Sequence, residues 1–183
     1  MEIKAIETEY NGYRFRSRLE ARWAVFFDAM KIPYEYEPEG YKFEDGTLYL
    51  PDFRIQVRHR SYTDEWEPVF VEIKGLMSPR DKQKIEKLSE YYPVIVLGEL
   101  PANEKGYFDW FHEHDGFHSY RYMDGDEYPA AFSIYEDIPW ICGPDHDQYD
   151  GGKEMNAALL KARQARFEHG ETPSRYCALR NSY

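Results

Sequence analysis

The sequence predicts an α/β (α+β) fold in which helices flank a central sheet. Three observations support this fold class. Residues 17–30 carry an apolar stripe at helical spacing, β-branched runs at 69–75 and 93–100 are typical of buried strands, and a capped helical segment lies between those runs. With a strand pair before residue 58, the chain reads helix, three strands, helix, strand.

The first helix is expected over residues 17–30, "SRLEARWAVFFDAM". Ser17 has the chemistry of an N-cap, because its hydroxyl can accept a hydrogen bond from an amide of the first turn. The apolar stripe consists of Leu19, Trp23, Phe26, Phe27 and Met30. One side of this helix should therefore pack on the core.

A strand pair follows, with its arms at 34–43 and 48–57. The connection "EDGT" contains Asp-Gly, which favours a tight turn between antiparallel strands. The second arm, "LYLPDFRIQV", is apolar except at Pro51-Asp52. An acid in the middle of an otherwise buried strand requires an explanation.

The remaining elements have clear boundaries. The run "VFVEIKG" at 69–75 ends at a glycine, and the helix at 78–92 begins with Ser78 as cap and Pro79 at its first position. "PVIVLGEL" at 93–100 is expected to be a fully buried strand. A C-terminal helix is expected from about residue 154 to residue 168.

The charge distribution suggests three segments. The net charge of the 183 residues is −11, and residues 101–150 hold 2 basic and 12 acidic groups, a net −10. We therefore expect a core at 1–100, an acidic, aromatic-rich extension at 101–150, and a C-terminal helix and tail at 151–183. Such a balance argues against a nonspecific nucleic-acid coat protein, which needs many Lys and Arg side chains to neutralise phosphates.

The sequence predicts a cytoplasmic protein with no membrane partner. It has no basic segment followed by an apolar stretch at its start, and no apolar run near the ~18 residues of a membrane span. Cys142 and Cys177 neither form a C-x-x-C pair nor suggest a disulfide framework, which fits a reducing compartment.

Residues 52, 72 and 74 are the candidate active-site residues. Strand alternation places Glu72 and Lys74 on one face, about 6–7 Å apart along the strand. If the strand carrying Asp52 pairs beside them, two carboxylates and an ammonium converge. Paired carboxylates repel unless a cation joins them, and all-oxygen ligation with retained waters suits Mg²⁺. Such a site can hydrolyse phosphodiesters, with Lys74 orienting the attacking water.

Pro51-Asp52 followed by Glu72-Ile73-Lys74, after a glutamate in the first helix, resembles the PD-(D/E)XK nuclease superfamily. More narrowly, "YRFRSRLEARWAVFFDAMKIPYEYEPEGY" with "YLPDF" and "VEIKG" is similar to small phage and prophage nuclease-like proteins. The resemblance covers roughly residues 10–100. It implies a restriction-endonuclease-like core with a mixed sheet, Mg²⁺ replaceable by Mn²⁺, DNA as substrate, and the host cytoplasm as location if the gene is phage-borne. Glu20, Asp52 and Glu72 would be the metal ligands, and these three with Lys74 would be catalytic.

Each of these residues also has a plainer interpretation. Glu20 follows Ser17 by three positions, the spacing of a capping box. Asp52 could be a turn residue after proline, and Glu72 with Lys74 could be a solvated charge pair on a strand face. Asp52 is only a turn residue if its carboxylate lies more than ~8 Å from that of Glu72, because Mg²⁺ binds its oxygen ligands at ~2.1 Å.

Basic side chains near this site are candidate phosphate contacts in an otherwise acidic chain, and the alternative is ordinary helix solvation. They are Arg14, Arg16, Arg18, Arg22 and Lys82. Dimerisation would pool these arginines. A competing hypothesis is a catalytically silent acidic protein, of phage origin, that binds a basic host protein through residues 101–150. A structure-specific RNA nuclease is a third hypothesis.

A histidine group in the acidic segment offers a weaker metal hypothesis. Its members are His112, His114 and His118, with Cys142 and His146 further along. Zinc accepts such ligands, but the spacing lacks the two-plus-two pattern of structural zinc sites. Loop histidines are the more usual explanation.

Overall fold

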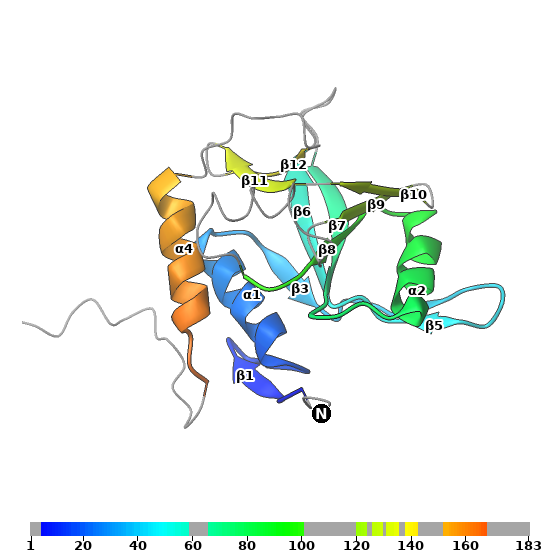
Figure 1. Ribbon diagram of the computed structural model, residues 1–183, viewed down its shortest axis with the longest axis horizontal. Helices are drawn as coiled ribbons and strands as arrows, with labels where there is room; N and C mark the ends of the chain where they lie inside the picture. Colours follow the sequence, from blue (N-terminus) through cyan, green and yellow to red (C-terminus); the bar gives the residue numbers. More distant parts are fainter. Residues whose placement is uncertain are drawn as a thin grey trace, which may run out of the picture.

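The computed structural model describes residues 5–58, 66–100, 120–123, 126–129, 131–135, 138–142 and 152–167. These ranges form a mixed α and β protein with a mixed central sheet (Figure 1). The three helices among them are α1 (Arg18–Ala29), α2 (Pro79–Ser89) and α4 (Gly152–Gln164). The predicted α+β class is confirmed at this level.

The central sheet has the strand order β10-β9-β8-β7-β6-β12-β11, with β3 also paired to β6. β6 and β7 are antiparallel, whereas β7 and β8 run parallel, because α2 carries the chain back between them. The strands are β3 (Tyr34–Tyr36), β6 (Phe53–Arg58), β7 (Trp66–Ile73), β8 (Val94–Leu97), β9 (Tyr120–Met123), β10 (Asp126–Pro129), β11 (Ala131–Tyr135) and β12 (Ile138–Cys142).

Two short hairpins lie outside this sheet. β1 (Thr8–Tyr10) pairs with β2 (Tyr13–Phe15) around Asn11-Gly12, both of which have positive φ. β4 (Tyr41–Lys42) pairs with β5 (Leu48–Tyr49) around the predicted Asp-Gly turn, where Gly46 has a φ of +82°. The hairpin of residues 41–49 projects beside α2 (Figure 1).

The helices cover opposite faces of the sheet. Alternating residues of β7 separate the faces: Val69, Val71 and Ile73 join the core with α1 and α4, whereas Phe70 packs with Ile85 and Leu88 of α2. Among the described helices, α2 is the one that packs on the face from which Glu72 and Lys74 project.

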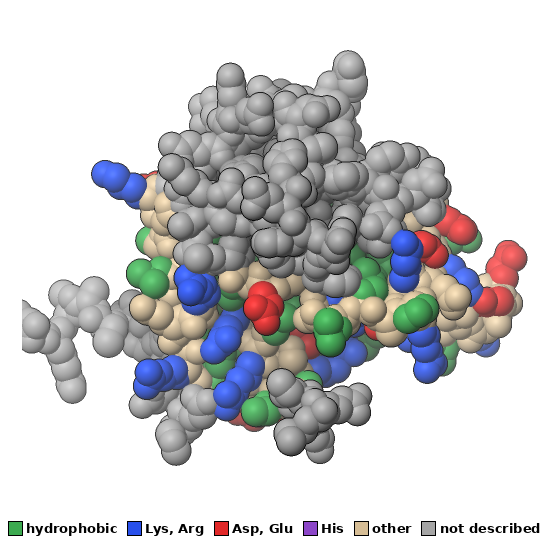
Figure 2. Space-filling view, viewed as in Figure 1, with side chains coloured by type: hydrophobic (Ala, Val, Ile, Leu, Met, Phe, Trp, Pro, Cys, Tyr) green, Lys and Arg blue, Asp and Glu red, His purple; other side chains and the backbone are tan. Residues whose placement is uncertain are grey.

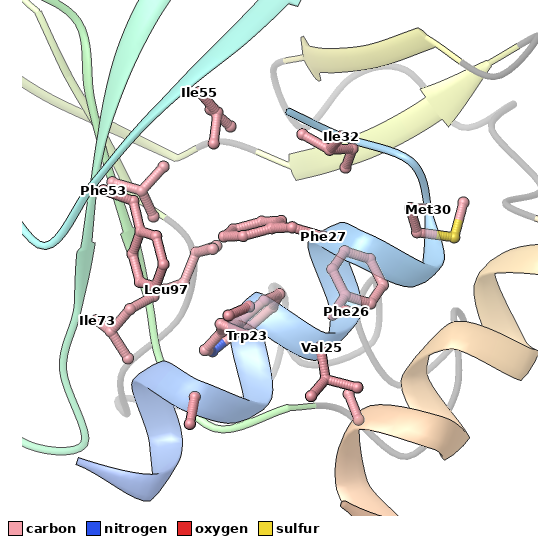
Figure 3. Packing of buried hydrophobic residues seen from close by; sticks show 14 of the residues in the cluster. Trp23, Val25, Phe26, Phe27, Met30, Ile32, Phe53, Ile55, Ile73 and Leu97 are labelled. Atoms are coloured by element: carbon pink, nitrogen blue, oxygen red, sulfur yellow. The ribbon is translucent and has the colours of Figure 1, made fainter. Parts of the chain in front are cut away.

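The larger core is rich in aromatic side chains (Figure 3). Trp23 and Phe27 of α1 point toward the sheet, and the Phe27 ring centroid lies 5.5 Å from that of Phe53. Phe53 itself is fully buried and also contacts the rings of Phe15, Tyr34 and Tyr36. This cluster anchors β6 directly after Asp52, the candidate metal ligand.

The predicted helices at 17–30 and 78–92 are confirmed with their caps. The Ser17 hydroxyl accepts a hydrogen bond from the Glu20 amide, and Ser78 and Asp81 form a reciprocal capping box. The C-terminal helix is also confirmed, and it packs on α1. The strand predicted at 93–100 forms over its central four residues.

The two long arms of the predicted strand pair are each divided. The first becomes β3 and β4, and the second becomes β5 and β6, separated at residues 50–52. Pro51 lacks an amide hydrogen and has a restricted φ, so a continuous ladder through this point is unfavourable. The expected single hairpin is therefore two successive antiparallel pairings, β4 with β5 and β3 with β6.

The described parts of residues 101–150 contribute four strands to the same sheet. β9 pairs with β8, and β12 pairs with β6, so hydrogen bonding continues across residue 100. The sequence did not predict these strands. Among the described residues, no helix is both long and apolar enough to cross a bilayer.

Candidate functional site

The break at Pro51 places Asp52 at the start of β6, where it is buried with 2% exposure. Because Phe53 pairs with Val71 in an antiparallel ladder, Asp52 lies opposite the level of Glu72. The Asp52 carbonyl accepts a hydrogen bond from the Glu37 amide at 2.8 Å. This bond continues the pairing of β3 with β6 and holds the Asp52 backbone from the edge opposite β7.

The Asp52 carboxylate has two donors from distant parts of the chain. Oδ2 accepts from the Ile73 amide at 2.8 Å, and Oδ1 accepts from Arg16 Nη2 at 2.5 Å. Burial raises the pKa of Asp52 well above its usual range, and the neighbouring Glu72 carboxylate raises it further, while Lys74 opposes both. A carboxylic acid with such a raised pKa requires a positive charge close by to stay ionised at neutral pH.

Buried Glu72 and partly exposed Lys74 form a pair on the α2 face of the sheet. Lys74 Nζ lies 2.7 Å from Glu72 Oε1, and the Tyr49 hydroxyl donates to Glu72 Oε2 at 2.7 Å. Asp81, at the start of α2, approaches Lys74 Nζ to 3.9 Å. The β-strand alternation that predicted Glu72 and Lys74 on one face is confirmed.

Protonation states follow from these contacts. Burial works against charge on Lys74, but Glu72 and Asp52 outweigh it, so the pKa of Lys74 is raised above its usual value. Burial and the adjacent Glu72 carboxylate raise the pKa of the Tyr49 hydroxyl well above its usual range. At neutral pH Lys74 is an ammonium and Tyr49 is a neutral hydrogen-bond donor.

A cleft of about 640 Å³ opens onto this pair. Glu72 and Lys74 line it from β7, Asp81 and Lys84 from α2, and Tyr49 from the hairpin. Figure 1 shows how the hairpin of residues 41–49 and α2 lie together beside the sheet. The cleft thus combines a buried acid and ammonium with an entrance bordered by further positive charge.

Arg16 lines the same cleft and stands between it and Asp52. Its side chain is half exposed, with Nη2 on Asp52 and Nε 2.8 Å from Glu37 Oε1. Asp52 itself does not line the cleft. Arg16 therefore serves as a counter-cation for Asp52.

Glu20 is buried at the N-terminus of α1 and serves as part of the cap. Oε1 accepts from the Ser17 hydroxyl at 2.7 Å, while Oε2 accepts from the Arg16 amide at 3.0 Å and from the Tyr36 hydroxyl at 2.7 Å. Glu20 does not line the cleft. Glu20 therefore supports the cap by accepting from the Arg16 amide and the Ser17 hydroxyl, and not from the Ser17 amide as in a capping box. The role of Glu20 as a third metal ligand stays a prediction.

The donor chemistry of Asp52 and Glu72 suits a hard cation. In the described part of the chain, no three His, Cys, Asp or Glu side chains come together as a metal-binding group. Each Asp52 and Glu72 oxygen has one protein donor, and a carboxylate oxygen can accept more than one. Two carboxylates with several waters are an ordinary set for Mg²⁺. The residues present therefore fit a Mg²⁺ ion held by Asp52 and Glu72.

The structure places one of the predicted phosphate contacts at the cleft and the others away from it. Arg16 reaches the cleft, whereas Arg14, Arg18, Arg22 and Lys82 do not line it. Arg14 pairs with Glu7, and Lys82 pairs with Glu86 one helical turn away at 4.0 Å. The histidines of the zinc hypothesis lie outside the described residues.

Several residues of the site were missed from the sequence. Tyr49 and Asp81 line the cleft, and Tyr36 holds Glu20. Asp81 carried a readable signal, since "SPRD" is a capping box that begins at Ser78. Tyr49 precedes Asp52 by three residues, but only the split at Pro51 turns its hydroxyl to Glu72.

Comparison of the chain with protein-family models, with curated proteins and with solved structures finds no match.

Proposed function

We propose that this protein is a Mg²⁺-dependent endonuclease that hydrolyses DNA phosphodiester bonds, and that its core is of the restriction-endonuclease-like type. The observation that carries the proposal is the pair of buried Glu72 and partly exposed Lys74, which opens onto the cleft beside buried Asp52. A solvated charge pair on a strand face needs neither burial nor the tyrosine that fixes Glu72. Burial of two neighbouring carboxylates is costly, and such clusters concentrate at functional sites.

The side chains divide the work of hydrolysis. A bound Mg²⁺ ion supplies charge stabilisation at the phosphoryl group. Lys74, fixed as an ammonium by Glu72, can hold the attacking water or a phosphate oxygen, and Tyr49 keeps Glu72 oriented. Arg16 offers a second positive group at the cleft wall, suited to a phosphate oxygen once Asp52 has another cation.

The raised pKa of Asp52 gives the site a pH dependence. Metal ligation requires the ionised carboxylate, so protons compete with the metal below the pKa of the folded protein. Because burial and Glu72 raise that pKa, this competition extends to a higher pH than for an ordinary aspartate. Metal affinity should therefore rise as pH increases through the pKa of Asp52.

A cleavage assay tests the proposal. Supercoiled, linear, branched and single-stranded DNA, with single-stranded RNA of matched sequence, are incubated with Mg²⁺, Mn²⁺ or EDTA. We expect cleavage of at least one DNA form with either metal, none in EDTA, and loss of at least 10²-fold in rate for Asp52→Asn, because the amide removes the ligand charge.

The variants decide how a positive result is read. Metal-dependent cleavage that survives Asp52→Asn contradicts the assignment of the site. Cleavage of RNA alone would favour the structure-specific RNA nuclease. A binding protein without activity, acting through the net −10 of residues 101–150, is the second candidate. It is favoured if the protein neither binds divalent metal in calorimetry nor cleaves any substrate and instead captures a basic host protein.

A further inference from the structure

A second hollow lies beside the cleft. Its volume is about 360 Å³, and it is bounded by the turn of the 41–49 hairpin and by one side of α2. Leu48 and Lys84 line both the hollow and the cleft, so the two spaces adjoin at these side chains. Anything that lies in the cleft can continue past Lys84 into the hollow.

The α2 wall of this hollow is basic. Arg80, Lys84 and Lys87 follow one another at spacings of four and three residues, which places them on one side of the helix. Arg80 and Lys84 form no ion pair with the described part of the chain. On the face seen in Figure 2, Lys and Arg side chains around α2 and the adjoining hairpin lie among Asp and Glu side chains.

Lys87 has a different role from the other two. It pairs with Asp45 and donates to the Thr47 hydroxyl at 3.0 Å, so it ties the hairpin turn to α2. This contact lowers the pKa of Asp45 to about 2. The hollow is therefore a built feature whose walls are held together, with Arg80 and Lys84 left to face solvent.

We propose that this hollow binds the DNA backbone on one side of the scissile phosphate, with Arg80 and Lys84 contacting successive phosphates. The proposal rests on the proposed function, because the reacting phosphate would sit in the cleft at Lys74. Exposed Leu48, at the junction, offers an apolar surface for a sugar or base edge. The acidic net charge makes such a local basic track the means of binding a polyanion.

Salt-dependent binding tests this inference. Fluorescence anisotropy with labelled duplex and single-stranded DNA is measured in EDTA, which keeps the strand intact, from 50 to 200 mM salt. The double variant Arg80→Ala/Lys84→Ala is expected to bind about tenfold more weakly and to lower the slope of log K against log salt by roughly 1.4–1.8, since each lost phosphate contact contributes about 0.7–0.9.

The matched control removes two positive charges elsewhere. Lys153→Ala/Lys161→Ala changes two exposed lysines of α4, neither of which lines the hollow or the cleft. Its salt slope should equal that of the wild type. Circular dichroism and thermal unfolding show that both variants are folded, as expected for exposed positions.

Three outcomes overturn the inference: equal slopes for the two double variants, no DNA binding by the wild type, or tighter binding of RNA of the same sequence. The inference and the nuclease proposal fail separately. If Arg80→Ala/Lys84→Ala lowers the salt slope but the wild type never cleaves DNA, the hollow is a DNA site and the nuclease proposal fails. If Asp52→Asn abolishes cleavage but Arg80→Ala/Lys84→Ala has the salt slope of the wild type, the nuclease proposal stands and the hollow is not a DNA site.

Discussion

Lys74→Ala is expected to lower the rate of DNA cleavage by about 10²–10³-fold, the usual effect of removing one preorganised donor from a transition state. The ammonium is fixed 2.7 Å from Glu72 Oε1 and faces the cleft, so its loss removes both a charge and a hydrogen-bond donor. The loss should fall on kcat rather than on KM, because Lys74 acts at the reacting centre.

Lys82→Ala is the matched control, since it removes one lysine charge close by in sequence and does not line the cleft. It should retain the wild-type kcat. Metal titration by calorimetry should show that Lys74→Ala still binds the ion through Asp52 and Glu72. A Lys74→Ala enzyme with the wild-type kcat would remove Lys74 from the mechanism.

Phe53→Ala should lower the free energy of unfolding by about 3–5 kcal/mol. Phe53 is fully buried, and its ring centroid lies 5.3 Å from that of Tyr36 and 5.5 Å from that of Phe27. Truncation removes the ring that joins α1, β3 and β6, and it leaves a cavity that rigid neighbours cannot fill. Urea unfolding with linear extrapolation measures the change.

Tyr91→Ala provides the surface comparison for this stability experiment. Tyr91 is an aromatic residue with 65% exposure, so its truncation should alter the free energy of unfolding by no more than about 0.5 kcal/mol. A loss below about 1 kcal/mol for Phe53→Ala would contradict the packing described for this core.

The sequence predicted the elements whose signals are local. The stripe of the first helix, the cap at Ser17 and the capping residues Ser78 and Pro79 all depend on side chains within a few positions, and all are confirmed. The hairpin of β1 and β2 could also have been predicted. Asn11-Gly12 is a strong turn signal, because both central residues of a type I′ turn have positive φ.

Features that depend on distant partners could not be read from the sequence. Of the four strands within 120–142, β9 pairs with β8 and β12 pairs with β6, and nothing in the acidic and aromatic composition of this segment indicates those partners. The contact between Arg16 and Asp52 joins residues 36 positions apart. Arg16 was predicted as a phosphate contact, and the structure shows that its guanidinium first neutralises the buried acid.

The candidate site was predicted in part for the same reason. Alternation along one strand was enough to put Glu72 and Lys74 on one face, and the contact between them is confirmed. The tyrosine on Glu72, the cleft and the position of α2 over it arise only when hairpin, helix and sheet pack together. No periodic pattern of residues in the sequence signals such tertiary placement.

Location of Mn²⁺ by anomalous diffraction tests the central claim most directly, namely that Asp52 and Glu72 together hold the catalytic metal. Crystals soaked in Mn²⁺ at pH 8 should show an anomalous peak within about 2.0–2.6 Å of oxygens from both carboxylates, with Arg16 displaced from Asp52 Oδ1. The peak should weaken at pH 5, as protons compete for Asp52. A pH 8 crystal without a peak between Asp52 and Glu72, or with Mn²⁺ bound only elsewhere, would contradict the account.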